Sequence, residues 1–204
     1  MRVKPNAVVV PEGLGVGRRR KRAVYVGRMS DEKGVRTIVE AWRGGLAWIP
    51  LLMVGSGPLD GELRGLAAGN ESVTFTGGLP AAEAYRAIGE SELLLLPTEC
   101  YETFGRTVLE AYALGTPVIS TRGTAPGCLV REGETGFLVD RGDVEGLRGA
   151  VAGFFDLPDE RRRELGVNAL RVYEAEFSEA ANLAILESIY REAMDEAAAR
   201  MGRS

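Results

Sequence analysis

Short apolar runs alternate with longer segments of helical pattern from residue 23 onward, and this alternation constrains the fold more than any other feature. The runs are rich in β-branched residues and lie at 23–28, 49–58, 72–77, 93–97, 117–120 and 135–140. Such runs, separated by amphipathic segments, are typical of a parallel sheet that helices cover on both faces. The sequence therefore predicts a doubly wound, Rossmann-like α/β domain of about six strands, with helices at its C-terminus.

The two ends of the chain depart from this alternation. Residues 1–22 are interpreted as a linker-derived strand and turn followed by a basic run, 23–177 as the Rossmann-like domain, and 178–204 as a C-terminal helix. The apolar residues of that helix recur at helical spacing, at Leu183, Leu186, Ile189, Tyr190 and Met194. They fit either a stripe packed on this domain or an element that reaches across to another domain.

The charge balance argues against nucleic acid or an acidic membrane as a partner. The 204 residues have 25 Lys and Arg against 29 Asp and Glu, a formal net charge of −4, whereas nucleic-acid-binding domains are usually basic. The exception is the run "GRRRKR" at 17–22. We interpret it as a solvated stretch before the first strand, with a contact to anionic lipid as the alternative.

Residues that usually hold metals are scarce. Histidine is absent, and Cys100 and Cys128 lack the spacing of a metal site. There is no D-x-D motif and no P-loop, so we expect no metal and no cofactor. The sequence shows no signal peptide and no long apolar segment, which predicts a cytoplasmic protein with reduced thiols. The absence of glutamine hints at a thermophilic source.

The stretch "PTECYETFGRTVLEAYALG" (97–115) follows an apolar run and predicts a helix that begins near Thr103, a plausible N-cap. Backbone N–H groups from Phe104 to Thr107 would then point outward, and Gly105 would let a ligand approach the backbone closely. A helix start of this kind favours a phosphate oxygen.

Two glutamates flank this predicted helix start. Glu110 lies seven residues after Thr103, which returns it to nearly the same helix face about 10 Å along the axis. We expect Glu110 to accept hydrogen bonds from ribose hydroxyls, and Glu102 to face the sugar of a phosphorylated sugar nucleoside. The alternative is an i, i+4 ion pair between Arg106 and Glu110 on a solvated face.

Phosphates also need cations, and "GRMSDEKG" supplies Arg28 and Lys33 just after the first predicted strand. Both could reach a diphosphate, Arg28 as a fork and Lys33 as a point charge, although most such pairs near a turn are only solvated. The segment "GSGPLD" fails the dinucleotide-loop spacing, because Leu59 and Asp60 occupy its last two positions.

Five segments occur in a fixed order: "VGRMSDEKG", "MVGSGP", "VTFTG", "LLLLPTECYETFGRTVLEAYALGTPVIS" and "EGETGFLVDRGD". Together they resemble the C-terminal, nucleotide-sugar-binding domain of the family 4 retaining glycosyltransferases, which are two-domain enzymes of the GT-B fold. The resemblance covers about residues 6–177. It implies metal-independent transfer of a sugar from a nucleotide diphosphate sugar to an acceptor, with the anomeric configuration retained.

The resemblance also implies roles for individual residues. Arg28 and Lys33 look like the cations that stabilise the diphosphate leaving group, and with Glu102 they form the implied catalytic set. Loops after Gly57 and Phe75 would shape the base pocket. The nucleotide-sugar-binding set implied in this way is Gly27, Arg28, Lys33, Gly57, Phe75, Glu102, Thr103, Phe104, Gly105, Arg106, Thr107 and Glu110.

Two departures from the family pattern bear on function. Gly127 stands where the family usually has a glutamate, and the N-terminal, acceptor-binding domain is missing from this sequence. The implied partners are the nucleotide-sugar donor and that missing domain. Any peripheral contact with the inner face of a membrane is expected only through the absent half, and this chain alone is expected to transfer little.

Other functions stay open at this stage. One is a non-catalytic, GT-B-like module that binds a nucleotide or a partner, which the departures favour. Another is half of a GT-B-fold epimerase, which would share the same nucleotide cleft. The nucleotide base, the donor sugar and the acceptor are not set by the sequence.

Overall fold

A parallel six-stranded sheet forms the centre of the computed structural model, which describes residues 8–10, 19–100 and 104–201. The strands are ordered β3-β2-β1-β4-β5-β6. Their bounds are β1 Arg20–Val26, β2 Leu51–Val54, β3 Val73–Gly77, β4 Ser91–Leu96, β5 Val118–Thr121 and β6 Gly136–Val139. The predicted doubly wound, Rossmann-like sheet is confirmed.

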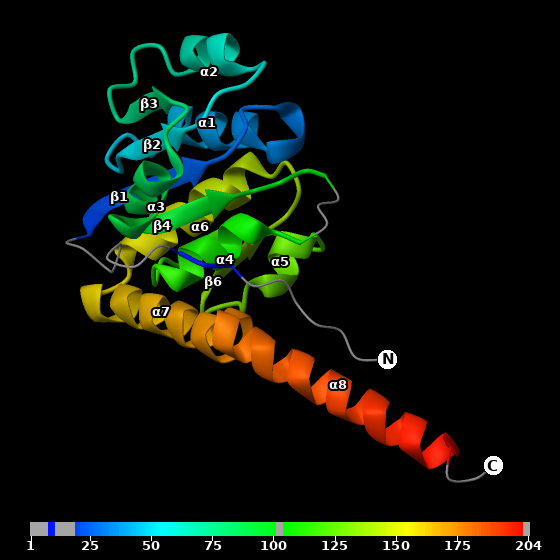
Figure 1. Ribbon diagram of the computed structural model, residues 1–204. Coiled ribbons are helices and arrows are strands. Elements are labelled where there is room, and N and C mark those ends of the chain that lie inside the picture. Colours follow the sequence, from blue (N-terminus) through cyan, green and yellow to red (C-terminus); the bar gives the residue numbers. More distant parts are fainter. Residues whose placement is uncertain (1–7, 11–18, 101–103, 202–204) are drawn as a thin grey trace.

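Helices cover both faces of this sheet (Figure 1). One face packs against α1 Val35–Arg43, α2 Asp60–Leu66 and α6 Val144–Asp156. The other packs against α3 Ala81–Gly89, α4 Arg106–Ala113, α5 Ala125–Leu129 and α7 Asp159–Val172. The short η1 Asp31–Lys33 precedes α1, and η2 Tyr173–Phe177 joins α7 to α8 Glu179–Met201.

The core has two layers, one on each face, because alternate residues of a strand point to opposite faces. Tyr25 and Met53 belong to the layer with Trp42 of α1, whereas Val24 and Leu94 belong to the layer of α3 and α4. All of these side chains are buried. Strands that are buried on both faces explain why the apolar runs show no polar alternation.

The second half of the basic run belongs to the sheet, and its interpretation as a solvated stretch is wrong for Arg19 and Arg22, whereas Arg20 and Lys21 are exposed and residues 17–18 lie outside the described residues. Strand β1 begins at Arg20, and Arg22 is largely buried, with its Nε donating to the Ser91 hydroxyl at 2.8 Å. Arg19 is half-buried and donates to backbone carbonyls, while Arg20 stays exposed. Backbone carbonyls and the Ser91 hydroxyl bind the Arg19 and Arg22 guanidinium groups, which the charge pattern suggested were in water.

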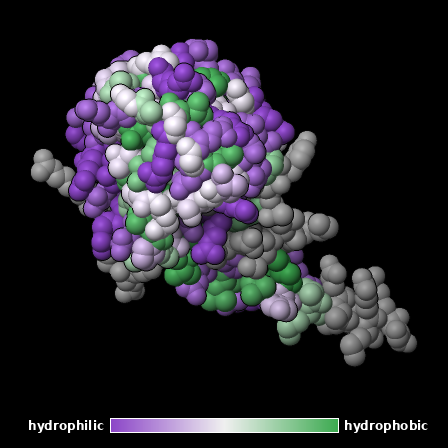
Figure 2. Space-filling view, turned by 90° about the horizontal axis from the view of Figure 1, so that it is seen from above, coloured by the Kyte–Doolittle hydropathy of each residue, from purple (hydrophilic) through white to green (hydrophobic). Residues whose placement is uncertain are grey.

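The C-terminal helix α8 extends away from the body (Figures 1 and 2). Leu183, Tyr190 and Met194 are exposed along it, so the interpretation of the apolar stripe as packed on this domain is wrong for these residues. That the helix crosses to another domain stays a prediction. Within the described residues, no helix combines the length and hydropathy needed to cross a bilayer.

Candidate functional site

The strand order reverses between β1 and β4, which lie side by side at the centre of the sheet. β1 is followed by α1 on one face and β4 by α4 on the other. In open α/β sheets a ligand binds at such a switch point, outside the carboxyl ends of the strands. The loops after β1 and β4 therefore define the candidate site.

Backbone and side-chain hydrogen bonds join these two loops. The carbonyl oxygen of Glu32 accepts from the Thr98 hydroxyl and from the Glu99 N–H, each at 2.9 Å. Gly34 makes this approach possible, because a Cβ there would lie 1.8 Å from the Pro97 carbonyl oxygen. The loop after β1 is thereby fixed against the end of β4.

Arg28 and Lys33 lie in that fixed loop, Arg28 exposed and Lys33 half-buried. The Tyr25 hydroxyl donates to the Arg28 carbonyl at 2.7 Å, which fixes the backbone at this point. A hydrogen bond from the Ser30 hydroxyl lowers the pKa of Glu32, and the positive charges of Arg28 and Lys33 lower it further. Both cations therefore act on one small region beside the end of β4.

Helix α4 begins at Arg106 and its N-cap is Gly105, two residues after the predicted N-cap Thr103. Gly105 has φ +86°, a left-handed conformation that suits glycine, and a Cβ there would lie 2.7 Å from Pro126 Cα. Thr103 is therefore not the N-cap, because the chain turns at Gly105 to pass Pro126. Arg106 and Thr107 form the first turn of the helix.

Glu110 is consequently one turn into α4, not two turns below its start. Its Oε1 accepts from Arg106 Nε at 2.9 Å and from the Tyr85 hydroxyl at 3.3 Å. Hydrogen bonds with Tyr85 and Glu110 raise the pKa of Arg106, and the one with Tyr85 has the larger effect. The ion pair given above as the alternative is thus present, but its face is not fully solvated: Glu110 is 14% exposed and Arg106 is 69% exposed.

The loops after β1 and β2 also fit closely together. A Cβ at Gly55 would lie 1.8 Å from the Gly27 carbonyl oxygen, and one at Gly57 would lie 2.4 Å from the Met29 carbonyl oxygen. On the neighbouring strand, the half-buried Phe75 ring packs against the core and lies 4.9 Å from the Arg64 guanidinium carbon. Gly57 thus lies beside the loop after β1, whereas Phe75 lies on the edge strand β3, with β2 and β1 between it and the switch point.

Residues 20–156 match the family model described as glycosyl transferases group 1. The chain belongs to this family. It is 31% identical over 183 residues to the phosphatidyl-myo-inositol mannosyltransferase of Mycobacterium leprae, covering 83% of this chain and 49% of that protein. It is 35% identical over 141 residues to the GDP-mannose-dependent alpha-mannosyltransferase of Corynebacterium glutamicum, covering 69% and 32%.

The fold of this glycosyl transferase chain also matches solved structures. The Anabaena protein HepE in complex with UDP-glucose aligns with a TM-score of 0.72 and 23% identity, covering 84% of this chain and 49% of that one. The predicted resemblance to the C-terminal domain of a GT-B glycosyltransferase is confirmed for family and fold. The chain spans about half or less of the length of these curated relatives.

The structure of this glycosyl transferase chain leaves some predicted residues untested. Glu102 and Thr103 lie outside the described residues, and Phe104 is half-buried against the α4 layer. Thr98 and Glu99, which join the two loops, are not among the predicted site residues, although polar residues so soon after a buried strand are a signal for them. Among the described residues, no group of three or more Cys, Asp or Glu side chains could hold a metal ion.

Proposed function

We propose that this chain is the donor-binding half of a retaining glycosyltransferase that transfers a sugar from a nucleotide diphosphate sugar to an acceptor. The observation that carries the proposal is the placement of the α4 start, with Gly105 as its cap, across the switch point from Arg28 and Lys33. An oriented helix start and two cations provide what a diphosphate needs for binding. Membership of the family supports the same chemistry.

In this proposal Arg28 and Lys33 bind the diphosphate and stabilise the negative charge that develops on it when the glycosidic bond breaks. Fixed positive charges of this kind can serve in place of a divalent metal. The backbone N–H groups of Arg106 and Thr107 bind the distal phosphate, because the dipole of α4 favours negative charge at this end.

Glu110 binds the ribose. Its carboxylate has to exchange its hydrogen bonds with Arg106 and Tyr85 for ribose hydroxyls, and the exposed Arg106 side chain is then available to the phosphates. Glu102 is assigned to the hydroxyls of the donor sugar. A further domain is proposed to bind the acceptor and to close the cleft over the donor, so we expect little transfer by this chain alone.

Isothermal titration calorimetry with UDP, GDP and ADP tests the proposal. We expect at least one of them to bind, and Lys33→Ala to weaken that binding about tenfold by removing a direct cation–phosphate contact. Lys21→Ala is the matched control. Lys21 lies in β1, ahead of the loop that carries Lys33, and its ammonium group contacts the Trp48 ring and not the candidate site. The proposal fails if the wild type binds none of the three nucleotides at millimolar concentration.

A non-catalytic module with the same fold is the second candidate, and Gly127 is the observation that favours it. A Cβ at Gly127 would lie 2.0 Å from the Thr121 carbonyl oxygen, so the glutamate usual in the family cannot be restored here without a backbone shift.

Hydrolysis of the nucleotide-sugar donor distinguishes the two candidate functions. The chain joined to an acceptor domain would release sugar from its nucleotide as a transferase, and Glu102→Ala would abolish that release; a binding module releases none.

A further inference from the structure

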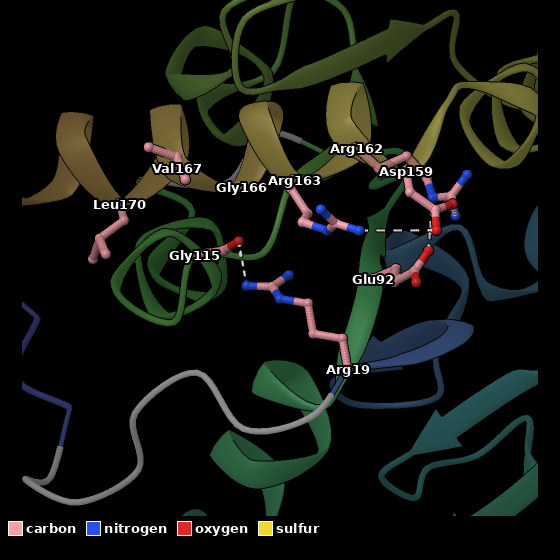
Figure 3. Close-up of a pocket in the computed structure, with 9 residues that line it drawn as sticks. All are labelled: Arg19, Glu92, Gly115, Asp159, Arg162, Arg163, Gly166, Val167 and Leu170. Carbon is pink, nitrogen blue, oxygen red and sulfur yellow. Dashed lines mark hydrogen bonds and ion pairs between the residues drawn. The ribbon is translucent and has the colours of Figure 1, made fainter.

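Arg19 binds the end of helix α4 that is opposite to the candidate phosphate site. Its guanidinium donates to the carbonyl oxygens of Leu114 at 2.9 Å and Gly115 at 2.5 Å, and to that of Ser91 at 3.4 Å. Figure 3 shows the side chain reaching from the residue before β1 toward Gly115. Burial lowers the pKa of Arg19, and the charge of Glu92 partly opposes that effect.

Arg19 binds the two carbonyl groups that directly follow α4, whereas the Ala111 and Tyr112 carbonyls in its last turn accept from backbone N–H groups. No basic residue lies in its last turn, and Leu114, its C-cap, has non-helical backbone angles. A helix leaves its last carbonyl groups without partners inside the helix, and a cation at this end also compensates the dipole. Arg19 supplies both the donors and the charge from a position 95 residues away from Leu114 in the sequence.

A cavity beside Arg19 leaves room for α4 to shift. Its volume is about 490 Å³, and Arg19, Gly115, Gly166 and Val167 are among the residues that line it (Figure 3). The helix end is closely packed on the side of α7, where a Cβ on Gly166 would lie 2.4 Å from the Gly115 carbonyl oxygen. The buried side chains of Tyr112 and Leu114 also hold it, and the guanidinium adds hydrogen bonds on the side of the cavity.

We propose that Arg19 is a positioning residue for donor binding, which it serves by fixing α4 along its axis. The inference rests on the proposed function. Helix α4 has eight residues, a rigid rod of about 12 Å, so a shift at Gly115 moves the N–H groups of Arg106 and the carboxylate of Glu110 together. Binding groups that move by about 1 Å lose much of their effect.

The experiment compares Arg19→Met with Arg22→Met in the full chain. Arg22 is the matched control, because it is also largely buried and also donates to the end of a helix, the Ala87 carbonyl of α3, which carries no predicted site residue. UDP, GDP or ADP, whichever the wild type binds, is titrated calorimetrically under conditions where thermal melts show every variant to be folded. Amide NMR spectra follow the signals of Arg106 and Thr107.

We expect Arg19→Met to weaken nucleotide binding about tenfold and to shift both amide signals. Arg22→Met should lower the melting temperature to a similar extent. It should leave nucleotide affinity and the amide signals of Arg106 and Thr107 unchanged. Equal affinity in the Arg19→Met variant and the wild type would overturn the inference, as would equal losses in both variants. Failure of the wild type to bind any nucleotide would instead overturn the proposed function, so the two failures are distinguishable.

Discussion

The helix ends at the two edges of the sheet are satisfied in different ways. At the edge where the strands begin, arginine side chains donate to the carbonyl groups that end the helices. Arg19 binds the end of α4, Arg22 that of α3 and Arg162 that of α6, while Arg148 donates to the Ala41 carbonyl of α1 at 3.3 Å. The negative ends of these helix dipoles are thus compensated within the chain.

At the edge where the strands end, the helix starts differ in their caps, and α2 and α3 have Leu59 and Pro80 as N-caps without a side-chain hydrogen bond. Helices α5 and α6, after β5 and β6, have side-chain caps: Thr124 accepts from the Gly127 N–H at 3.1 Å, and Asp143 from the Gly146 N–H at 2.8 Å. Helices α1 and α4, which flank the switch point, have Gly34 and Gly105 as N-caps, and glycine has no side chain to accept a hydrogen bond.

The contrast between compensated helix ends and glycine-capped helix starts indicates where the chain can bind an anion. Compensated helix ends stabilise the fold, whereas a helix start with glycine as its cap presents backbone N–H groups to whatever approaches it. Apart from those at Arg19, substitutions at the strand-starting edge should therefore change stability alone. Substitutions at the switch point should change nucleotide affinity, unless they also break the contact between the two loops.

Gly34→Ala should have the largest effect, because it breaks that contact. Gly34 has φ +67°, and the added Cβ would meet the Pro97 carbonyl, so we expect a loss of about 3 kcal/mol or more in the free energy of unfolding. Gly45→Ala is the control: its φ is +137°, but nothing lies within 4 Å, so only backbone strain of about 1 kcal/mol remains. If urea denaturation shows the same loss of unfolding free energy in Gly34→Ala and Gly45→Ala, the two loops are not held in close contact.

Arg162→Met tests the opposite edge. Its side chain is 9% exposed and donates to the carboxylate of Glu92 at 2.8 Å and to the Leu157 carbonyl at 2.5 Å. Removing it leaves these partners poorly satisfied, which should cost about 2–3 kcal/mol of stability. Nucleotide affinity should not change. Arg163→Met is the control, since Arg163 is 70% exposed and should cost at most about 0.5 kcal/mol. A loss of affinity in Arg162→Met would contradict the separation of the two edges.

The sheet could be predicted from the sequence because strand burial leaves a local signal. A parallel strand that is covered on both faces is a continuous apolar run, and Leu93 to Leu96 illustrate it. The cations after β1 could be predicted in the same way, because Arg28 and Lys33 follow such a run directly. Both features depend on residues within one short segment.

The roles of Arg19 and Gly105 could not be predicted, because they depend on contacts between segments far apart in the sequence. A basic run has the same pattern whether it is solvated or bound to carbonyl groups, and the acceptors of Arg19 lie in β4 and at the end of α4. Thr103 was a reasonable N-cap on local preference. The approach of Gly105 to Pro126, which fixes the later start of α4, is a tertiary contact.

Glu110→Gln compares affinity with stability at a single site. The i, i+4 ion pair with the exposed Arg106 guanidinium contributes only about 0.3–0.5 kcal/mol, and a glutamine oxygen can still accept from the Tyr85 hydroxyl, so stability should change little. Nucleotide affinity should fall about tenfold, because a charged acceptor of ribose hydroxyls is replaced by a neutral one. The loss should disappear with a nucleotide that lacks both ribose hydroxyls. Glu187→Gln, which breaks the i, i+4 pair with Arg191, is the control. If both variants keep full affinity, Glu110 does not bind the ribose.

The smallest effect is expected at the start of α6, where Asp143→Ala removes a side-chain cap. The lost hydrogen bond to the Gly146 N–H should cost about 1 kcal/mol in urea denaturation, whereas Asp143→Gly should cost only a few tenths, because glycine is a tolerable N-cap. Nucleotide affinity should stay at the wild-type value in both variants. The small cost of glycine would explain how α1 and α4 can begin without a side-chain cap. A loss of 1 kcal/mol or more in Asp143→Gly would instead mean that these two helix starts are held in place chiefly by their contacts with Pro97 and Pro126.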